Sequence, residues 1–171
     1  GTRTPRGPVA VIGIPETRRT GGSGLLVAWG VSDPGNVGTL IRTAAGFGWD
    51  FGHTAGTADP WSPKVLRAGA GGHFRIGIRG VDSVAGLEKG GYVPAATVVA
   101  GGTPPADLAP GRYAVLIGEE SSGLPPEVVK QSAVIVTIPM PGGLESLNAA
   151  MAAGIIVYEL SKLGREGEGR V

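Results

Sequence analysis

Short apolar runs of strand length alternate along this chain with segments of helical periodicity, and this alternation restricts the fold more than any other feature. Buried strands are expected at 25–31, 112–118 and 133–139, where apolar residues follow one another without a polar face. Runs of this kind are typical of parallel sheets that helices cover on both sides. The sequence therefore predicts an α/β fold with a mostly parallel sheet, helices on both faces and a single core.

The remaining segments extend the same alternation. Helices are expected at 36–48, 63–70, 82–90, 126–131 and 146–163, and further strands at 51–54, 74–78 and 96–100, with an edge strand at 9–14. The predicted domain covers residues 24–163. Residues 1–23 are expected to form a linker or edge segment, and residues 164–171 a frayed tail.

Composition excludes several classes of protein. With 32 glycines and 14 prolines in 171 residues, disorder has to be considered, but 42% hydrophobic and 17% charged residues indicate a packed core. The chain has no cysteine and only two histidines, which argues against disulfides, thiolate metal sites and a histidine-rich metal centre. No apolar run has the length of a membrane span or a signal peptide, so we expect a cytoplasmic protein without a membrane partner.

The net charge of +1 conceals an asymmetry between the two halves of the chain. Residues 1–79 carry nine basic and four acidic side chains, a balance of +5, which leaves −4 for residues 80–171. Such asymmetry is typical of a surface for a polyanion. Ordinary solvated charges that interleave in the fold would give the same count, and charge alone does not distinguish the two.

Three loops of unusual composition follow predicted strands, at 33–36, 118–123 and 138–148. Ligands of parallel sheets bind beyond the carboxyl ends of the strands, where such loops meet. None of the loops has the lysine and serine or threonine of a Walker loop, and no GxGxxG follows the first strand, which argues against nucleoside triphosphates and dinucleotides. Glycine-bounded loops suit a flat, neutral or cationic ligand better. Taken singly, each loop is equally consistent with a turn or a helix cap.

In combination, these loops carry a family resemblance. The motifs are DPGNVGTLIRTAAGFG at 33–48, DPWSPKVLRAGAG at 59–71, VLIGEESSGLP at 115–125 and IPMPGGLESLNAAMAAGIIVYE at 138–159. In this order they resemble the SpoU (TrmH-type) branch of the SPOUT RNA methyltransferases, over residues 24–163. The resemblance implies a C-terminal trefoil knot, a rare exception to the rule against threaded loops.

The resemblance also implies a function: S-adenosylmethionine-dependent 2′-O-methylation of a ribose in structured rRNA or tRNA, by a homodimer without a metal. Alternatives are a non-catalytic RNA-binding module of the same fold and a SPOUT methyltransferase that acts on a base atom. The presence of the motif residues argues against the first, and the Asn…Arg and Ser-Leu-Asn patterns favour the ribose-directed branch. A small-molecule α/β enzyme lacks a nucleophile–base pair here.

The catalytic residues implied by the resemblance are Arg42, Asn36, Glu120, Ser146 and Asn148. Arg42 would lie beside the reacting ribose, in its own or the partner subunit's site. Since arginine is a poor proton acceptor, we expect it to clamp a phosphate and stabilise the developing alkoxide. Asn36 would orient Arg42 or the RNA, and Glu120 would organise the site. Asn36 and Ser146 could equally be helix N-caps.

The resemblance places the cofactor against backbone groups of Gly118, Ile138 and Leu147, with the loop of Ala100 and Gly101 as another wall. The expected RNA contacts come from basic side chains: Arg42, Lys64, Arg67, Arg18 and Arg19. The C-terminal helix is expected at the dimer interface because it is rich in small residues: Ala149, Ala150, Ala152, Ala153 and Gly154.

Three features depart from the family pattern. Residues 1–23 are too few for the N-terminal substrate-binding domain that many members carry, so the chain is expected to be a catalytic-domain fragment or a minimal enzyme. Glu119 stands where asparagine is frequent, and Gly69 where serine is frequent. The first departure bears on which RNA is used, and the other two leave the chemistry intact.

Overall fold

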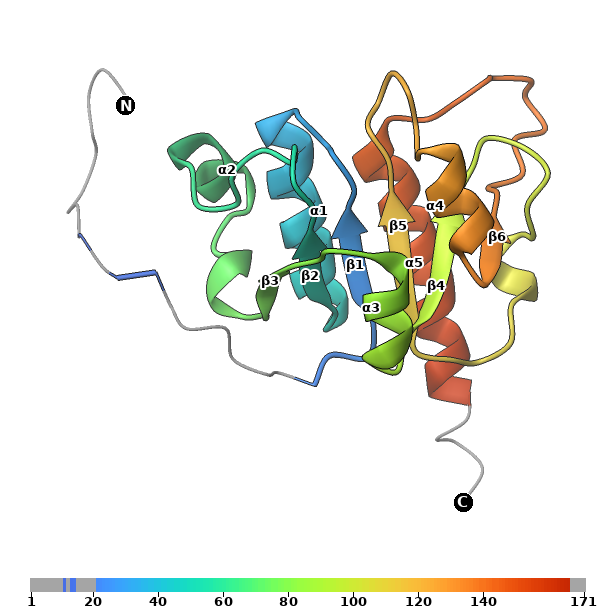
Figure 1. The fold of residues 1–171 in the computed structure, drawn as a ribbon, viewed down its shortest axis with the longest axis horizontal. Helices are drawn as coiled ribbons and strands as arrows, with labels where there is room; N and C mark the ends of the chain where they lie inside the picture. The colour runs from blue at the N-terminus through green and yellow to red at the C-terminus, as the bar shows by residue number, and fades with distance from the viewer. Residues whose placement is uncertain (1–10, 12, 15–20, 167–171) are drawn as a thin grey trace.

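The chain folds into a six-stranded parallel sheet with helices on both faces (Figure 1). The computed structural model describes residues 11, 13–14 and 21–166, and the side chains up to residue 163. The strand order is β3-β2-β1-β5-β4-β6. The strands are β1 Leu25–Ala28, β2 Asp50–His53, β3 Ile78–Gly80, β4 Val93–Thr97, β5 Tyr113–Ile117 and β6 Val134–Val136.

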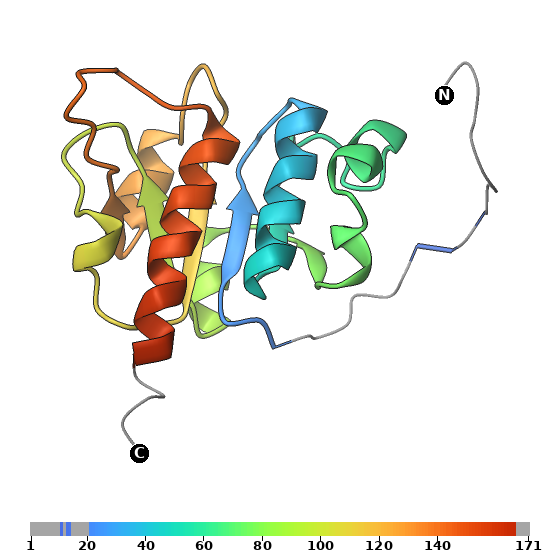
Figure 2. The ribbon, with the colours of Figure 1, turned by 180° about the vertical axis from the view of Figure 1, so that it is seen from behind.

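Helices cover the sheet in two layers. They are α1 Pro34–Phe47, α2 Pro63–Ala68, α3 Val84–Lys89, α4 Pro126–Gln131 and α5 Ala149–Glu166, with short 3-10 turns η1 Gly72–Phe74 and η2 Pro105–Asp107. Helices α1 and α5 lie side by side on one face (Figure 2), and α3 and α4 cover the other (Figure 1). None of the helices among the described residues combines the length and apolarity needed to cross a bilayer.

The alternation of side chains in β1 shows why both faces must be covered. Leu26 and Ala28 belong to the core beneath α1 and α5, whereas Leu25 and Val27 belong to the core beneath α3 and α4, and all four are fully buried. A strand with apolar residues on both faces is stable only when helices cover each of them. The predicted α/β fold with a parallel sheet is thus confirmed, while the trefoil knot stays a prediction.

Helix α1 has sharp ends. Oδ1 of Asp33 accepts a hydrogen bond of 2.8 Å from the backbone N–H of Asn36, which makes Asp33 the N-cap. The alternative reading of Asn36 as the N-cap is therefore wrong, and its side chain is free for another role. At the other end, Gly48 adopts the left-handed conformation, with a φ of 71°. This conformation is common for a glycine at the C-terminal end of a helix.

Close approach of backbones brings α2 and η1 against α1. A Cβ on Gly38 would lie 2.3 Å from the Cβ of Ala68 and 2.8 Å from the carbonyl oxygen of Val65, so the α1–α2 contact requires glycine at this position. Similarly, a Cβ on Gly69 would lie 2.4 Å from the imidazole ring of His73. Glycine in place of the family's frequent serine at position 69 therefore makes room for a buried histidine.

Several predicted boundaries are wrong. The strand predicted at 74–78 is Ile78–Gly80, because Gly72–Phe74 form a 3-10 turn and pairing with β2 begins only where the N–H of Phe51 reaches the carbonyl of Gly77. Strand β4 ends at Thr97 rather than at residue 100, and β6 covers only Val134–Val136. The predicted edge strand at 9–14 lies largely outside the described residues.

The last helix also begins later than predicted. It starts at Ala149 rather than at 146, because Oδ1 of Asn148 accepts hydrogen bonds of 3.0 and 3.2 Å from the N–H groups of Ala150 and Met151. This is the geometry of an N-cap, so the reading of Ser146 as the cap is wrong. The helix continues to Glu166, past the predicted domain end at residue 163.

Candidate functional site

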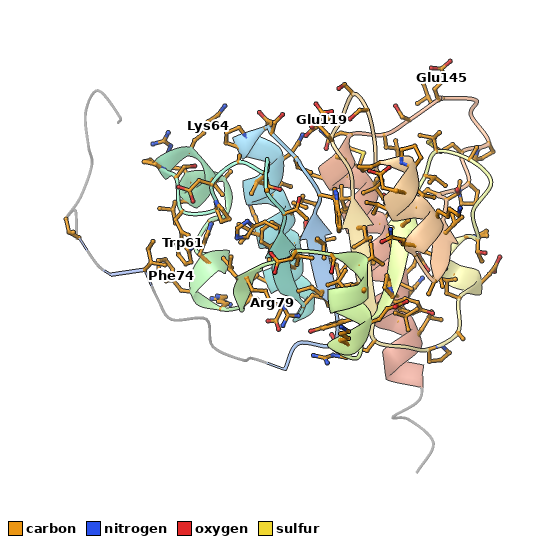
Figure 3. The ribbon with its side chains drawn as sticks, viewed as in Figure 1. Trp61, Lys64, Phe74, Arg79, Glu119 and Glu145 are labelled. Atoms are coloured by element: carbon orange, nitrogen blue, oxygen red, sulfur yellow. The ribbon has the colours of Figure 1, made fainter. Side chains whose placement is uncertain are left out.

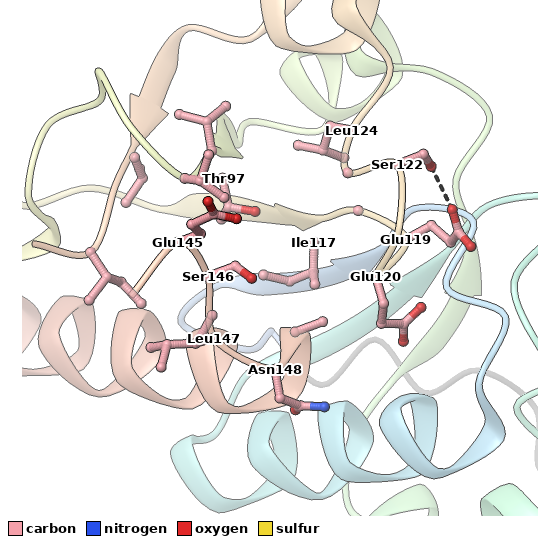
Figure 4. Close-up of a pocket in the computed structure, with 18 of the residues that line it drawn as sticks. Thr97, Ile117, Glu119, Glu120, Ser122, Leu124, Glu145, Ser146, Leu147 and Asn148 are labelled. Atoms are coloured by element: carbon pink, nitrogen blue, oxygen red, sulfur yellow. Dashed lines mark hydrogen bonds between the residues drawn. The ribbon is translucent and has the colours of Figure 1, made fainter. Parts of the chain in front are cut away.

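A pocket of about 720 Å³ opens at the carboxyl ends of β4, β5 and β6. Its apolar wall consists of side chains from the strand ends and the loops that follow them: Ile117, Leu124, Ile138 and Leu147. Polar loop residues complete the rim (Figure 4). The pocket lies where parallel sheets bind their ligands, and residues of the motifs at 115–125 and 138–159 line it together.

The loop after β5 is held tightly by backbone contacts. A Cβ on buried Gly118 would lie 2.2 Å from the carbonyl carbon of Gly123 and 2.4 Å from the backbone nitrogen of Leu124. Gly123 has a φ of 70° and donates its N–H to the carbonyl of Glu119 at 2.8 Å. Only glycine fits at position 118, so this motif residue sets the shape of the pocket floor.

Glu119 fixes the tip of the same loop. Its carboxylate accepts a hydrogen bond of 2.5 Å from the hydroxyl group of Ser122 (Figure 4) and one of 2.9 Å from that of Ser121. These hydrogen bonds, from Ser122 first and then Ser121, hold the pKa of Glu119 below its ordinary value. The side chain is therefore ionised at neutral pH and acts as a brace for the loop.

A hydrogen-bond chain connects three of the four motifs, at 33–48, 115–125 and 138–159. Nδ2 of Asn148 donates to Oδ1 of Asn36 at 3.1 Å, and Nδ2 of Asn36 donates to Oε1 of Glu120. Because Oδ1 of Asn148 caps α5, its amide can present only Nδ2 to Asn36, and each amide in the chain has a fixed orientation. The network places the carboxylate of Glu120 at the edge of the pocket.

The pocket is electrostatically negative. The carboxylates of Glu119, Glu120 and Glu145 line it, and among the described residues no lysine, arginine or histidine does. A phosphate-bearing ligand would be repelled, whereas a positively charged one would be attracted. This matches the sequence-based expectation of a flat, neutral or cationic ligand.

Most of the residues predicted for catalysis and cofactor binding come together here. The pocket is lined by Gly118, Glu120, Ile138, Ser146, Leu147 and Asn148. Ala100 and Gly101 do not line it, because β4 ends at Thr97 and the wall after it consists of Thr97, Val98 and Val99. Asn36 reaches the pocket only through its hydrogen bonds to Glu120 and Asn148.

Arg42 lies elsewhere on α1. It is exposed and follows Asn36 by six residues, so at 100° per residue the two side chains point to different sides of the helix. Its Cα lies beside Gly72 of η1, and among the described residues no hydrogen bond or ion pair holds its guanidinium. Arg42 therefore does not line the pocket of its own chain.

The other predicted RNA contacts flank α1. Lys64 of α2 is exposed, with its Nζ 4.0 Å from the carboxylate of Asp33, and Arg67 is exposed on the same helix. Figure 3 shows Lys64 and the pocket residues Glu119 and Glu145 along one edge of the molecule. Arg18 and Arg19 lie outside the described residues.

The sequence reasoning did not single out many of the lining residues, and two of these lie in the loop after β6. Glu145 and Met140 belong to the glycine loop after β6, and Glu145 directly precedes the predicted Ser146. The signal for Glu145 was its position as the only carboxylate of that loop. No group of three potential metal-ligating side chains is found in the described part of the chain.

The two histidines occupy different places. His73 is buried, and its Nε2 lies 2.8 Å from the carbonyl oxygen of Pro60. His53, at the end of β2, lines a smaller hollow of about 350 Å³. Burial lowers the pKa of both rings, opposed at His53 by the nearby charge of Asp59 and at His73 by the hydrogen bond with Pro60.

Comparison with known proteins identifies similar chains. Residues 24–158 match the model of the SpoU rRNA Methylase family. The chain is 35% identical over 164 residues to the 23S rRNA (guanosine(2553)-2′-O)-methyltransferase RlmP of Bacillus subtilis, covering 93% of this chain and 66% of that protein. It is 37% identical to an uncharacterised tRNA/rRNA methyltransferase of Synechocystis, covering 78% and 51%. The chain thus spans between half and two thirds of these relatives.

Among solved structures, an AdoMet-bound rRNA methyltransferase from Sinorhizobium meliloti superimposes with a TM-score of 0.74 at 32% identity, covering 82% of this chain and 57% of that one.

Proposed function

The chain belongs to the SpoU rRNA methylase family, and we propose that it transfers a methyl group from S-adenosylmethionine to a 2′-oxygen of ribose in structured RNA. One observation carries this proposal. The hydrogen-bond chain from Asn148 through Asn36 to Glu120 joins three motifs beside a negatively charged pocket. A chain that has lost catalysis has no need to hold these side chains in a fixed orientation.

The pocket fits the cofactor in shape and charge. Position 118 has space only for glycine because the backbone of Gly123 and Leu124 packs against it, and we propose that a flat adenine ring lies on the floor formed by this loop. The apolar wall suits the same ring, and the three carboxylates suit a cation. When bound, S-adenosylmethionine supplies a methyl group on a positively charged sulfur. We propose that Gly118, Ile138 and Leu147 hold its adenosine part.

The protein must then align the ribose and stabilise its 2′-oxygen. Alignment of two reactants supplies roughly 7–11 kcal/mol of barrier reduction in favourable cases. The 2′-oxygen would take up the methyl group that the cofactor supplies, and the proton of the hydroxyl group would leave to solvent. Arg42 would clamp the neighbouring phosphate and stabilise negative charge on the oxygen. Asn36, Glu120, Ser146 and Asn148 would position the reacting groups.

Ribosomal and transfer RNA are the substrate classes we propose, with the cytoplasm as the place of action. The B. subtilis relative is named for a guanosine 2′-oxygen of 23S rRNA. A solved chain titled for 2′-OH methylation of C/U34 on tRNA superimposes with a TM-score of 0.75 at 31% identity, covering 85% of this chain and 99% of that one. Exposed Lys64 and Arg67 of α2, which packs against α1, would contact the RNA backbone.

We also propose that the protein is a homodimer, joined along α5. The small residues Ala150 and Ala153 are buried within the chain, so they serve packing against the chain's own core. The opposite side of α5 exposes large apolar side chains, with Phe47 of α1 against Tyr158. This stripe consists of Met151, Ile155 and Tyr158, with 59%, 37% and 52% of their surface exposed. Exposed apolar stripes of this kind mark association sites.

The decisive experiment incubates purified protein with methyl-labelled S-adenosylmethionine and unmodified rRNA or tRNA. A 2′-O-methyl group blocks alkaline cleavage of the next phosphodiester, so we expect label in alkali-resistant dinucleotides. Label in alkali-sensitive mononucleotides would indicate base methylation, and RNA binding without label a non-catalytic module. Arg42→Ala should abolish transfer, whereas Arg75→Ala, which removes another exposed arginine, should not.

The proposed dimer is tested separately by light scattering of Ile155→Glu, which places a charge in the exposed apolar stripe of α5. We expect this variant to be a monomer of 17.1 kDa.

A further inference from the structure

Two arginines converge on one tyrosine, away from the pocket. Nη2 of Arg79 donates to the hydroxyl oxygen of Tyr92 at 2.7 Å, and Nη2 of Arg112 donates to the same oxygen at 2.8 Å. The guanidinium carbons lie 5.2 and 4.2 Å from the centre of the Tyr92 ring, which is buried. Arg79, Tyr92 and Arg112 are called the arginine–tyrosine cluster below.

The hydrogen bonding of the cluster is incomplete. A phenol oxygen has one hydrogen to donate and lone pairs to accept with. The two guanidinium groups both donate to the lone pairs of the Tyr92 hydroxyl oxygen. Among the described residues, nothing accepts the hydrogen of that hydroxyl group. Several N–H groups of each arginine are also without an acceptor in that part of the chain.

The charges of the cluster are likewise uncompensated. Two like charges are held against one atom, and neither guanidinium has an ion pair with a carboxylate of the described residues. Cation–π contact with one ring stabilises each arginine, but it does not remove their mutual repulsion. An anion beside the cluster would offset this repulsion, because it would attract both charges, and it would also accept the hydroxyl hydrogen of Tyr92.

We propose that the arginine–tyrosine cluster binds a backbone phosphate of the substrate RNA, an inference that rests on the proposed function. The planar guanidinium of arginine can donate two parallel hydrogen bonds to the oxygens of one phosphate, and the tyrosine hydroxyl supplies a further donor. A phosphate held here is one of a polyanion that continues to the pocket.

The position of the cluster makes it a second, separate contact. Tyr92 and Arg112 directly precede β4 and β5, whereas the pocket lies beyond the carboxyl ends of the same strands. Five residues of strand separate the two ends by roughly 15 Å. In Figure 3, Arg79 lies away from the edge that carries Lys64, Glu119 and Glu145. The RNA would therefore pass over the side of the sheet that α3 covers.

The test measures RNA affinity at several salt concentrations for the parent, Arg79→Gln/Arg112→Gln and Tyr92→Phe. A control, Arg75→Gln, removes one exposed cation next to η1, which packs against α1. Loss of one phosphate contact should reduce the slope of log affinity against log salt by about 0.7–0.9 and weaken binding several-fold. The single-turnover rate at saturating RNA and the cofactor affinity should be unchanged. Tyr92→Phe keeps both charges and the ring and removes only the hydroxyl group. Weaker RNA binding by this variant would therefore indicate that the hydroxyl group contacts the phosphate.

Three outcomes would overturn the proposal. Unchanged affinity and slope in both variants, with a lower melting temperature, would assign the cluster to packing while leaving the proposed function intact. Stabilisation of the parent by inorganic phosphate, lost in the variants without any change in RNA binding, would make it a site for free phosphate. A parent protein that binds no RNA would remove the proposed function and this inference together.

Discussion

Asn148 and Asn36, 112 positions apart in the chain, share a hydrogen bond of 3.1 Å that joins the starts of α5 and α1. Each asparagine has a second contact on its own side: Asn148 caps α5, and Asn36 donates to Glu120 in the loop after β5. These contacts hold two adjacent helices and a loop in fixed positions relative to one another at the mouth of the pocket (Figures 2 and 4). The arrangement depends on the donor and acceptor ends of both amides, which makes it sensitive to isosteric substitution.

Asn36→Asp tests this dependence. The substitution keeps the shape of the side chain and the acceptor for Asn148, but it replaces the donor toward Glu120 with a second carboxylate. Hydrogen bonds to charged groups contribute about 1.5–3 kcal/mol, so we expect methyl transfer to fall by roughly 10- to 100-fold. Single-turnover rates measure this. Thr39→Asp, which adds the same charge at an exposed position of α1, should retain the parent rate, and equal losses in the two variants would contradict the role of the network.

Gly118→Ala tests the pocket floor. The new methyl group would lie 2.2 Å from the carbonyl carbon of Gly123, and backbone atoms cannot move aside as a flexible side chain can. We expect the loop to be displaced and S-adenosylmethionine affinity to fall at least 10-fold, as calorimetry would show. Gly142→Ala is the control, because a Cβ there meets nothing within 4 Å. Unaltered cofactor binding by Gly118→Ala would place the cofactor elsewhere.

Gly69 and His73 should be coupled. A Cβ at position 69 would lie 2.4 Å from the His73 ring, so Gly69→Ala should destabilise the fold by about 1–3 kcal/mol through overpacking. His73→Ala removes the ring and leaves a cavity, which the new methyl group partly fills. In denaturant unfolding, the double variant should therefore be more stable than the sum of the single effects predicts. Strict additivity would mean that the ring moves freely away from position 69.

Stability should also fall in mild acid because of the histidines. Burial lowers the folded-state pKa of His73 below its ordinary value of 6.5, so as the pH falls through 6.5 the unfolded chain binds protons before the folded one does. The stabilisation from the neutral ring is thus present above that pH and is lost below it. Melting temperatures between pH 7.5 and 5.5 should decline less steeply for His73→Gln than for the parent. Equal slopes would exclude His73 as a source of the decline.

Local sequence signals predicted the elements whose pattern is strong. The apolar run of β5 and the helical spacing of Val37, Leu40, Ile41 and Ala44 in α1 were sufficient to place those two elements. The short edge strand β3 was misplaced because its pairing with β2, rather than its own alternation, determines where it begins. The start of α5 was misplaced because Asn148 rather than Ser146 supplies the capping oxygen, and both side chains are good caps.

Some residues of the site were predicted correctly and others were not, because local sequence does not determine how the elements pack. Motifs identify residue types, so the residues that line the pocket by their position in the loops after β5 and β6 were found. Ala100 and Gly101 were displaced by the early end of β4. The direction in which Arg42 points depends on how α1 packs against α2 and η1, and close contacts at Gly38 and Gly72 determine that packing. Motif spacing carries no information about it.

The position of Arg42 yields the last prediction, which rests on the proposed dimer. Arg42 does not line the pocket of its own chain, so we expect it to act in the pocket of the partner subunit. Heterodimers of Arg42→Ala with Gly118→Ala test this at a cofactor concentration well below the Kd of Gly118→Ala, where each homodimer should be inactive. If Arg42 acts across the interface, the intact pocket of the first subunit meets the intact arginine of the second, and up to half of the parent rate should return. If Arg42 acts within its own subunit, every site in the heterodimer carries a defect and no activity returns. Heterodimers of the parent chain with Gly118→Ala should reach about half of the parent rate in either case, and single-turnover methylation of RNA by differently tagged, co-purified pairs measures all three.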